Sequence, residues 1–497
     1  MSKENNEWGS NLSFVLAIIG SAVGLGNIWR YPYVLYSNGG GAFYIPYIVA
    51  ILVLAIPFLI LEFGVGYNFK SSFAKGITNI NPKFQYFGWF LPVIIFIMTI
   101  YYSTIIGWNG IYFILSFFKG WGSDPNMFLS HSVLHASGSL GDITTFVPLV
   151  GISILVCWLI VWYISHKKVS SGLSNISLYF IPMLFIIMIF IVAFSLTLPG
   201  ASIGLNQLLS PDWSILGNFS VWMAAFGQVF FSLSIGLGIS FTFVSYTKDD
   251  VNLISSVFYV ILGNSLFENF AALGVFSILG YMSYQSGVPI SEIVSQGTTL
   301  IFVAYPTVFN LLGNISYLLG PLFFLTVLIS GITSMLSSFE VFSSSIQNKF
   351  NISRKNAVTI LCIVGAALSM VFATAPGEFL VQVTDEFVNE IALVISVFIE
   401  CLIFSWVFNM KKLADFFNSQ HNFLKLGRWW IVTLRYILPM VLIVIWIGGI
   451  YEIILNESFD HLILLALLSI FSLISAFVFT KMPPRSKNWF NADERIK

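Results

Sequence analysis

The stretch Gly20–Pro32, GSAVGLGNIWRYP, is the sequence feature that most restricts how this chain can fold. It lies inside an apolar segment, roughly Leu12 to Tyr36, that is long enough to cross a lipid bilayer. A membrane-spanning helix satisfies its own backbone hydrogen bonds, yet each glycine weakens it by about 1 kcal/mol and a buried arginine is costly. We therefore expect a broken helix whose free carbonyl and amide groups face a ligand.

The composition places the whole chain in the membrane. Hydrophobic residues make up 57% of the 497 residues and charged residues only 9%, whereas soluble domains carry about 25% charged residues. The net charge is zero, which gives no electrostatic reason to expect nucleic-acid binding. Because the polar N-terminus leads directly into a full-length span, we expect no cleavable signal peptide. The cysteines Cys157, Cys362 and Cys401 lie in apolar spans and are interpreted as core residues.

A hydropathy window of about 19 residues predicts twelve membrane spans. Their approximate extents are 12–36, 42–66, 88–118, 146–165, 174–197, 219–246, 251–281, 308–346, 356–373, 381–409, 429–454 and 460–480. Lysine and arginine cluster in every second loop and in the tail 481–497, while the alternate loops carry only Lys119. This asymmetry predicts that both termini are cytoplasmic.

A second glycine-rich break appears in the sixth span. SLSIGLGIS, at Ser232–Ser240, shares a Gly-Leu-Gly core with SAVGLGN of the first span. The pattern predicts two inverted five-helix repeats, 12–197 (helices 1–5) and 219–409 (helices 6–10), with the first and sixth helices unwound. Two further helices (429–480) and a tail (481–497) complete a single transporter domain, 1–497. Paired breaks of this kind mark the binding site in transporters with inverted repeats.

Neutral oxygen donors lie on or beside these breaks. Na⁺ is a hard cation that prefers several oxygen ligands, as Ca²⁺ and Mg²⁺ do. Asn27, Ser232, Asn264, Thr333 and Ser334 could supply them without burying a full negative charge. Alone, each serine or threonine could simply bond back to its own helix. Together with two broken helices they indicate a sodium site.

Arg30 is the single basic residue well inside a span, and it needs an acidic partner. The candidates are Glu62, Glu268, Asp385, Glu386, Glu390 and Glu400. The depths of Arg30 and Asp385 in their spans match, so we expect these two to pair as an outer gate. Tyr102 and Phe231 are expected to form an apolar lid below the pair.

Two extracellular regions carry weaker patterns. His131 and His135 have a spacing of i, i+4 that could bind a metal, but a polar surface turn explains them better. Residues 282–307 are too polar to span the membrane and too apolar for a free linker. Their pattern favours a pair of short helices that dip toward the pore as a lid.

Long motifs resemble the neurotransmitter:sodium symporter family, and above all its prokaryotic amino-acid transporters with the bacterial leucine transporter fold. They are GSAVGLGNIWRYPY, NGGGAFYIPY at Asn38–Tyr47, IYYSTIIGW, VWMAAFGQVFFSLSIGLG and SGITSMLSS, and the resemblance covers nearly the whole chain. It implies an all-α polytopic membrane protein with twelve transmembrane helices. It also implies a plasma-membrane symporter, not an enzyme, which imports an amino acid with Na⁺ by alternating access.

The resemblance further assigns roles to individual residues of this sequence. The first sodium site maps onto Ala22, Asn27, Ser232 and Asn264, and the second onto Gly20, Val23, Ser330, Thr333 and Ser334. The substrate pocket maps onto Ala22, Gly24, Leu25, Gly26, Tyr102, Phe231, Ser232, Ser234, Leu237, Ser334 and Ser338. The gate maps onto Arg30, Gln228 and Asp385, and Glu62 matches an acid that supports the helix breaks.

Two positions narrow the expected activity. Gly24 stands where monoamine-transporting relatives have an aspartate, so the substrate should supply its own carboxylate, as an amino acid does. Glu268 stands where chloride-dependent relatives have a small polar residue, so no chloride requirement is expected, while the family pattern implies two Na⁺ sites. Ser330, Ser338 and Leu237 differ from some relatives, which affects the size of the preferred side chain. We expect a neutral, hydrophobic amino acid, carried by a monomer or a weak dimer.

Two other classes of membrane protein are alternatives to a transporter. A ligand-sensing receptor could keep the fold and lose transport, but the tail after Thr480 has only 17 residues and holds no soluble domain. A membrane-embedded enzyme would need a histidine-based metal cluster or a nucleophile with its base, and the spans show neither. Uptake measurements separate a transporter from a sensor.

Overall fold

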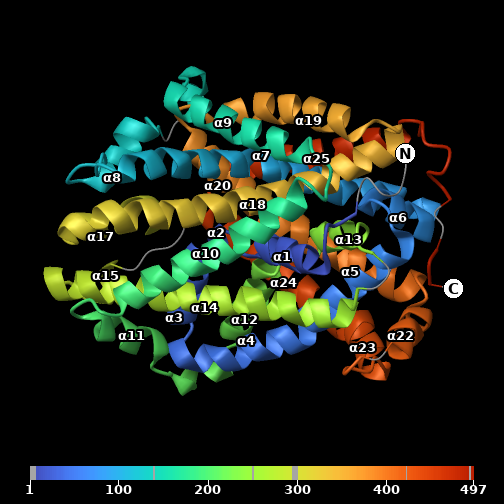
Figure 1. The fold of residues 1–497 in the computed structure, drawn as a ribbon, viewed down its shortest axis with the longest axis horizontal. Coiled ribbons are helices and arrows are strands. Elements are labelled where there is room, and N and C mark those ends of the chain that lie inside the picture. Colours follow the sequence, from blue (N-terminus) through green and yellow to red (C-terminus); the bar gives the residue numbers. More distant parts are fainter. Residues whose placement is uncertain are drawn as a thin grey trace.

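The computed structural model describes residues 7–137, 140–248, 251–293, 300–420, 422–491 and 494–496, and these ranges are mostly helical. Within them, extended pairing is limited to one isolated bridge between Phe146 and Thr374. The long helices run roughly along one axis (Figure 1), and both chain ends lie at one end of the bundle, here called the N/C end. The opposite end, here called the far end, carries the short helices α8 (Pro125–Met127), α11 (Ala201–Leu209) and α15 (Ile290–Ile293).

Ten helices in the described ranges are long and apolar enough to cross a membrane. They are Gly40–Phe69 (with α4, Tyr44–Ala50, and α5, Ile56–Phe69), Pro82–Ser116 (with α7, Gln85–Ser116), Pro148–Ser165 (α9), Leu173–Ser195 (α10), Leu253–Ser286 (α14), Gly313–Phe350 (with α18, Ser316–Phe350), Arg354–Phe372 (with α19, Arg354–Ser369), Gly377–Val407 (with α20, Gly377–Glu386, and α21, Val394–Leu402), Arg428–Asn456 (with α24, Leu438–Asn456) and Phe459–Lys481 (α25). The prediction of an all-α polytopic membrane protein is confirmed.

The first predicted span is broken. α1 (Asn11–Ala22) is capped by Val23, and α2 (Leu25–Trp29) and α3 (Tyr31–Ser37) continue at an angle of 57° to it. Ser10 caps the start of α1 by accepting a 3.1 Å hydrogen bond from the Ser13 amide. At the break, the Gly24 backbone is extended, so the helical ladder cannot continue through it. This bent pair forms an eleventh candidate span.

The sixth predicted span is broken as well. α12 (Phe219–Ser232) stops in mid-bundle, and the chain re-enters a helix only at α13 (Ile239–Val244). Between them Ser234, Gly236 and Gly238 have φ values of 51°, 69° and 66°. A Cβ atom on Gly236 would lie 2.0 Å from Val397 Cγ2, so only glycine fits this turn. The predicted count of twelve spans depends on treating α12 and α13 as one span, and it stays a prediction.

The eighth predicted span begins later than expected. Its predicted start at 308 lies within a separate helix, α17 (Tyr305–Leu311), and α18 itself begins at Ser316 after a tight turn at Gly313, whose φ is 62°. The predicted lid at 282–307 holds the end of α14, α15, the π-helix Leu300–Ala304 and the first residues of α17. Residues 294–299 of that region lie outside the described residues.

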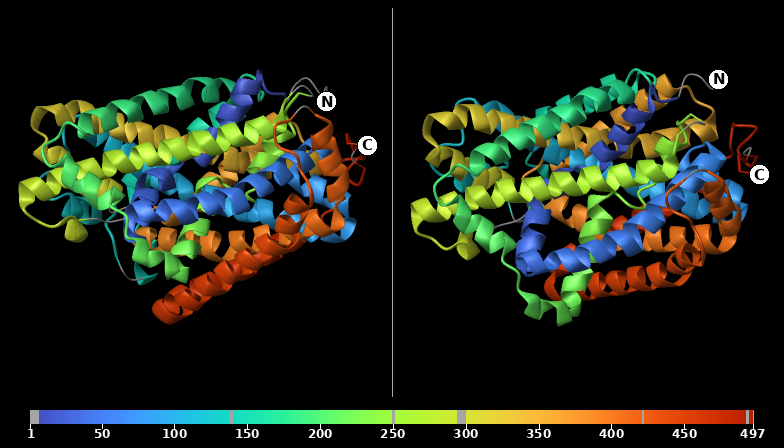
Figure 2. Two further views of the ribbon diagram at one scale, coloured as in Figure 1. Left: turned by 90° about the horizontal axis from the view of Figure 1, so that it is seen from below. Right: turned by 60° about the horizontal axis from the view of Figure 1, so that its bottom comes forward.

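The breaks lie at the centre of the bundle. α1 packs against α10, α14 and α18, while α13 packs against α5. α24 runs along the edge of the bundle in both views of Figure 2, and most of its apolar surface, like that of α25, is exposed. A chain whose outer helices are apolar and whose polar side chains face inward is built for lipid surroundings.

Candidate functional site

A pocket of about 190 Å³ lies between the two helix breaks. Every residue that the resemblance assigns to the substrate lines it: Ala22, Gly24, Leu25, Gly26, Tyr102, Phe231, Ser232, Ser234, Leu237, Ser334 and Ser338. The predicted gate residues Arg30, Gln228 and Asp385 line it too. The structure thus brings together residues from α1, α2, α7, α12, α18 and α20.

Sequence reasoning missed several residues of this pocket. They are Ser21, Trp29, Met98, Tyr101, Phe230, Ile235, Ile239, Asn389 and Leu393, and Asn27 lines the pocket as well as its predicted sodium site. Helical spacing could have found some of them. Met98 is one turn before Tyr102, and Asn389 and Leu393 follow Asp385 at i+4 and i+8, which places each pair on one helix face.

The residues of the predicted first sodium site form one buried polar cluster. The Asn27 amide nitrogen lies 2.9 Å from Asn264 Oδ1 and 3.3 Å from Ser232 Oγ. Asn264 in turn donates to Ser232 Oγ at 2.5 Å. The Asn27 side-chain oxygen accepts a 2.9 Å hydrogen bond from the Gly24 amide, which ties the cluster directly to the first helix break. Ala22, the remaining member, is the last residue of α1.

Glu268 lies at the centre of a set of hydrogen-bond donors. Its carboxylate, fully buried on α14, accepts bonds from Ser232 at 2.7 Å, Gln228 at 3.2 Å and Asn27 at 3.4 Å. The Tyr47 hydroxyl donates to its other oxygen. Buried carboxylates are costly unless donors surround them, so this set of donors is suited to holding one negative charge.

The residues of the predicted second sodium site join the first break to α18. Ser330 Oγ lies 2.9 Å from the carbonyl oxygen of Val23, and Thr333 Oγ1 lies 3.0 Å from that of Gly20. Ser334 Oγ lies 3.3 Å from the carbonyl oxygen of Ser21. Because α1 ends here, its last carbonyl groups have no partner within the helix and point to these hydroxyls.

Glu62 reaches the second break from α5. Its fully buried carboxylate accepts a 3.4 Å hydrogen bond from the Gly236 amide, at the point where the helix is unwound. The backbone amides freed by a helix break need acceptors in a dry interior. This contact provides one.

The expected gate residues Arg30 and Asp385 make their direct contacts with other side chains in this structure, and their role as a gate stays a prediction. Arg30 Nη2 lies 3.9 Å from Glu390, its guanidinium stacks 4.5 Å above the Phe231 ring, and in the described residues no ion pair joins it to Asp385. Asp385 instead accepts hydrogen bonds from Tyr101 at 2.6 Å and Asn389 at 2.9 Å. The Asp385 carboxylate is therefore held on its own side of the pocket, while Glu390 lies farther along the same helix and is reached by Arg30.

The pocket is separated from each end of the bundle by different contacts. Arg30 and Phe231 also line a cleft of about 1000 Å³ between α12, α24 and the helix 377–407, so they form the wall between pocket and cleft. Toward the N/C end, Arg354 forms a bidentate ion pair with the buried Glu340, at 2.6 and 2.8 Å. Tyr246 donates to the same carboxylate at 2.7 Å.

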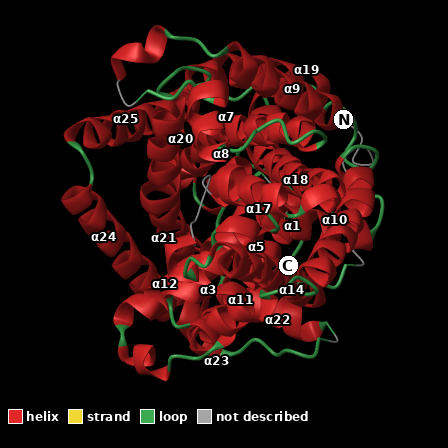
Figure 3. Ribbon diagram, turned by 90° about the vertical axis from the view of Figure 1, so that its left-hand side faces the viewer, coloured by secondary structure: helices red, strands yellow, loops and turns green. Residues whose placement is uncertain are grey.

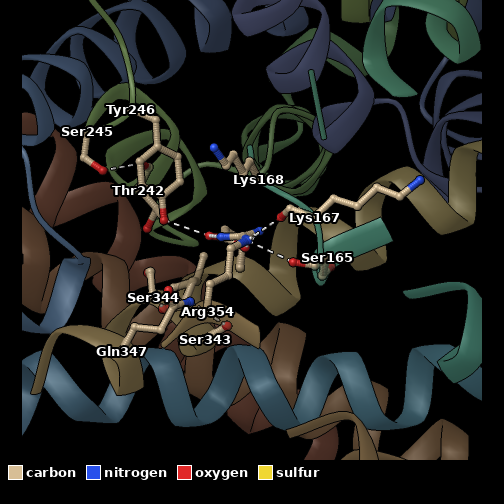
Figure 4. A network of polar contacts seen from close by, with 12 residues as sticks. Ser165, Lys167, Lys168, Thr242, Ser245, Tyr246, Ser343, Ser344, Gln347 and Arg354 are labelled. Atoms are coloured by element: carbon tan, nitrogen blue, oxygen red, sulfur yellow. Dashed lines mark hydrogen bonds and ion pairs between the residues drawn. The ribbon is translucent and has the colours of Figure 1, made fainter. Parts of the chain in front are cut away.

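Backbone oxygens complete this inner network. Arg354 Nε donates to the carbonyl oxygens of Ser165 at 2.9 Å and Lys167 at 2.8 Å, so it joins α19 to the end of α9 (Figure 4). Trp8 adds a further contact, from its indole nitrogen to the Phe243 carbonyl at 2.8 Å. The chain before α1 is thereby packed beneath α13.

Comparison with known proteins supports the transporter interpretation. The model of the sodium:neurotransmitter symporter family matches residues 5–137 and 121–462. An uncharacterized sodium-dependent transporter of Methanocaldococcus jannaschii is 39% identical over 439 residues, which cover 88% of this chain and 89% of that protein. More distant relatives are the human sodium- and chloride-dependent creatine transporter 1, 29% identical over 82% of this chain and 71% of its own, and the human sodium- and chloride-dependent GABA transporter 2, 27% identical over 83% and 74%.

These proteins are transporters and not enzymes, in agreement with the expectation from the motifs. The match covers both helix breaks, the pocket between them and all of the polar clusters described above. The chain is a multi-pass membrane transporter and belongs to the sodium:neurotransmitter symporter family.

Proposed function

We propose that the protein imports a neutral amino acid with a hydrophobic side chain, coupled to two Na⁺ ions and independent of chloride. The observation that carries the proposal is the pocket of about 190 Å³ enclosed by two broken helices. It is smaller than the roughly 300–1,000 Å³ of drug-sized ligand sites, which favours a small metabolite. Transport follows by alternating access, with the pocket opened to one side of the membrane at a time.

The pocket's own chemistry supports an amino acid. At Gly24 the pocket wall carries no side chain, so the protein places no acidic group there. A Cβ added at this position would lie 3.3 Å from Ser334 Oγ and 3.7 Å from the Tyr102 hydroxyl. Apolar side chains of Phe231, Ile235 and Leu237 cover another part of the wall. The substrate's carboxylate would then face the cluster around Asn27, and its side chain would lie against the apolar wall.

The oxygen-rich clusters support two sodium sites. Asn27, Ser232 and Asn264, with the Ala22 carbonyl, would hold the first Na⁺ beside the substrate carboxylate. The second Na⁺ would lie between the carbonyl groups at the end of α1 and the hydroxyls of Thr333, Ser334 and Ser330, with Gly20 and Val23 as backbone ligands. Each ion would replace the direct contacts of 2.5–3.3 Å that these groups make with one another.

Glu268 supports chloride independence. The donors Ser232, Gln228, Asn27 and Tyr47 surround its carboxylate as they would a bound anion. A fixed negative charge next to the first sodium cluster balances the cation in a medium of low dielectric constant. Chloride would then have neither room nor an electrostatic role.

The two barriers would open in alternation. The Arg30–Phe231 wall separates the pocket from the far end, and the Glu340–Arg354 network closes the N/C end. Lys and Arg cluster in the loops of the N/C end, so we propose that this end is cytoplasmic, with both termini inside the cell. Inward sodium flow through the plasma membrane gains about 2.3 kcal/mol per charge per 100 mV. We propose a monomer or weak dimer as the working unit.

Uptake into proteoliposomes tests the proposal. The purified protein is reconstituted, an inward Na⁺ gradient is imposed, and uptake is measured with a panel of labelled amino acids. Creatine and GABA are included because the relatives' names mention them. Sodium-dependent uptake of a neutral amino acid in the absence of chloride is expected. Binding without uptake would support the receptor alternative, and preferred uptake of creatine or GABA would contradict the substrate class.

A further inference from the structure

A histidine and two carboxylates from three helices meet at the far end of the bundle. His461 lies in the first turn of α25, Glu386 ends α20 and Glu457 follows α24. His461 Nε2 is 2.9 Å from Glu386 Oε2, and its Nδ1 is 2.9 Å from Glu457 Oε2. Figure 3, which views the far end, shows the loop that joins α24 to α25 at the edge of the bundle.

The three groups have the composition and proximity of a metal site. One ligand atom from each residue lies within 4.8 Å of the other two, and this is the single group of three such residues in the part of the chain that the structure describes. The cluster lies away from the sodium clusters and the substrate pocket. None of its members lines that pocket, although both glutamates line the neighbouring far-end cleft.

The histidine itself points to a ligand. Its side chain is only 1% exposed, and Nε2 has no partner of acceptable hydrogen-bond geometry among the described residues, even though Glu386 Oε2 is near. A buried polar atom without a partner is costly and calls for an explanation. A buried ring nitrogen and a carboxylate oxygen that lie 2.9 Å apart with poor hydrogen-bond geometry are arranged as two ligands of one cation.

We propose that His461 Nε2 and Glu386 bind Zn²⁺, while Glu457, which faces the other ring nitrogen Nδ1, accepts its proton in a hydrogen bond and orients the ring as an outer-shell carboxylate. Zinc binds one imidazole nitrogen at about 2.0–2.1 Å and carboxylate oxygens at about 2.0–2.2 Å, and it accepts water in its remaining positions. Mg²⁺ and Ca²⁺ favour sites made of oxygen alone, so the imidazole selects a transition metal. Two carboxylates and a neutral imidazole also balance the double charge of the ion.

The position of the cluster gives the ion a regulatory effect on transport, and this part rests on the proposed function. Glu386 directly follows Asp385, which lines the substrate pocket, and Glu390 of the next turn contacts Arg30. Zn²⁺ would tie this segment to α25 directly and to α24 through the contact between His461 and Glu457. Any movement of the gate relative to those helices would then require breaking a metal bond, so Zn²⁺ at the far end slows uptake.

Metal binding is measured first, on the full-length purified protein without any substrate. After treatment with a chelator, Zn²⁺ is titrated by calorimetry, and the melting temperature is followed with and without Zn²⁺. One saturable site and a higher melting temperature are expected. Glu386→Gln and Glu457→Gln should each weaken binding about 10-fold or more, because the first removes a charged ligand and the second removes the carboxylate that orients the imidazole; both keep the side-chain shape.

The chain offers a matched control. His131 and His135 also lie at the far end, but both are exposed and no acidic residue completes a cluster around them in the described ranges. The double variant His131→Gln/His135→Gln should bind Zn²⁺ like the wild type. Glu386→Cys should restore binding with a preference for Cd²⁺, because a thiolate is a softer ligand. If Glu386 had only a structural role, its replacement by cysteine would not change which metal the protein prefers.

The outcomes separate the two proposals. No saturable Zn²⁺ binding by the folded wild type, or loss of binding in the His131/His135 control, would overturn the metal site whatever the protein transports. The measurement needs no transport, so a failed uptake assay leaves it intact. If uptake is active, external Zn²⁺ should slow it in the wild type, and Glu386→Gln should remove that inhibition. Equal inhibition of both would contradict the regulatory effect.

Discussion

The Asn27 amide on α2 donates a 3.4 Å hydrogen bond to the Glu268 carboxylate on α14, across a sequence separation of 241 residues. This contact joins the first helix break to a buried negative charge. Ser232, at the end of α12, donates to the same oxygen at 2.7 Å, so the second break is joined to it as well. The charge state of one side chain therefore influences both broken helices.

Replacing Glu268 by serine should make transport depend on chloride. The variant keeps the donors Ser232, Gln228 and Asn27 but loses the fixed charge, so an external anion is needed to fill the space. Sodium-driven uptake is measured in chloride and in gluconate. The wild type should be equally active in both, and Glu268→Ser should be about 10-fold or more slower in gluconate. Equal rates for the variant in the two salts would contradict the role of this carboxylate.

Replacing Thr333 by valine should weaken sodium coupling. The change keeps the side-chain shape and removes the hydroxyl that lies 3.0 Å from the Gly20 carbonyl. We expect the sodium concentration for half-maximal uptake to rise about 10-fold, since one of a few oxygen ligands is lost. The measurement is uptake against Na⁺ concentration at fixed substrate.

Thr326 provides the control for that experiment. It is buried in the same helix α18, but its hydroxyl bonds back to the Leu322 carbonyl at 2.9 Å and faces no helix break. Thr326→Val should leave the sodium dependence unchanged, with at most about 0.5–1.5 kcal/mol of stability lost. A similar shift in both variants would mean that the effect comes from helix packing and not from a sodium ligand.

Replacing Gly24 by aspartate should abolish amino-acid uptake. Its carboxylate would enter the pocket beside Ser334 and Tyr102, where the substrate's own carboxylate is expected to lie. Two like charges about 4 Å apart repel by about 4 kcal/mol at an effective dielectric constant of 20, which is close to a thousandfold in affinity. The measurement is equilibrium binding of the labelled substrate found in the uptake panel.

The variant Gly24→Asn separates charge from size. Asparagine fills the same space without the negative charge, so it should bind the amino acid better than the aspartate variant does. The decarboxylated amine should show the opposite preference and gain affinity for Gly24→Asp. If asparagine and aspartate reduce amino-acid binding equally, crowding explains the loss and the inferred carboxylate position is wrong.

The sequence predicted the centre of the molecule well because the signals there are local. Glycines inside an apolar span can be recognised without neighbours, and both predicted breaks occur at Gly24 and at Ser234–Gly238. The start of α18 was placed too early because α17 is also apolar and only the turn at Gly313 separates the two. A hydropathy window averages over such a turn.

Contacts between distant helices could not be predicted in the same way. Depth along a span matched Arg30 with Asp385. The choice between Asp385 and Glu390, however, depends on how the helix 377–407 is rotated about its axis. The Tyr101 hydroxyl also donates a hydrogen bond to Asp385. The meeting of His461 with Glu386 and Glu457 requires the ends of three helices to be placed in space. No spacing within one segment carries that information.

Breaking the Glu340–Arg354 pair should destabilise the protein more than breaking any exposed ion pair. Glu340 is fully buried, and replacing it by glutamine leaves a buried guanidinium without its counter-charge, which typically costs about 3–5 kcal/mol. The Tyr246 hydroxyl would also lose its charged acceptor. Thermal unfolding of the purified protein in detergent should therefore show a clearly lower melting temperature for Glu340→Gln.

The pair Lys412–Glu494 is the matched comparison. Its atoms are 3.0 Å apart, close to the distances in the buried pair, but its side chains are 30% and 47% exposed. Glu494→Gln should cost no more than about 1 kcal/mol, because water screens the remaining charge. The double variant Glu340→Gln/Arg354→Gln should recover part of the loss of the single variant, since it leaves no unpaired buried charge. A double variant that loses the full sum of both single stability losses would show that the two side chains act independently. The ion pair could then not be the contact that closes the N/C end.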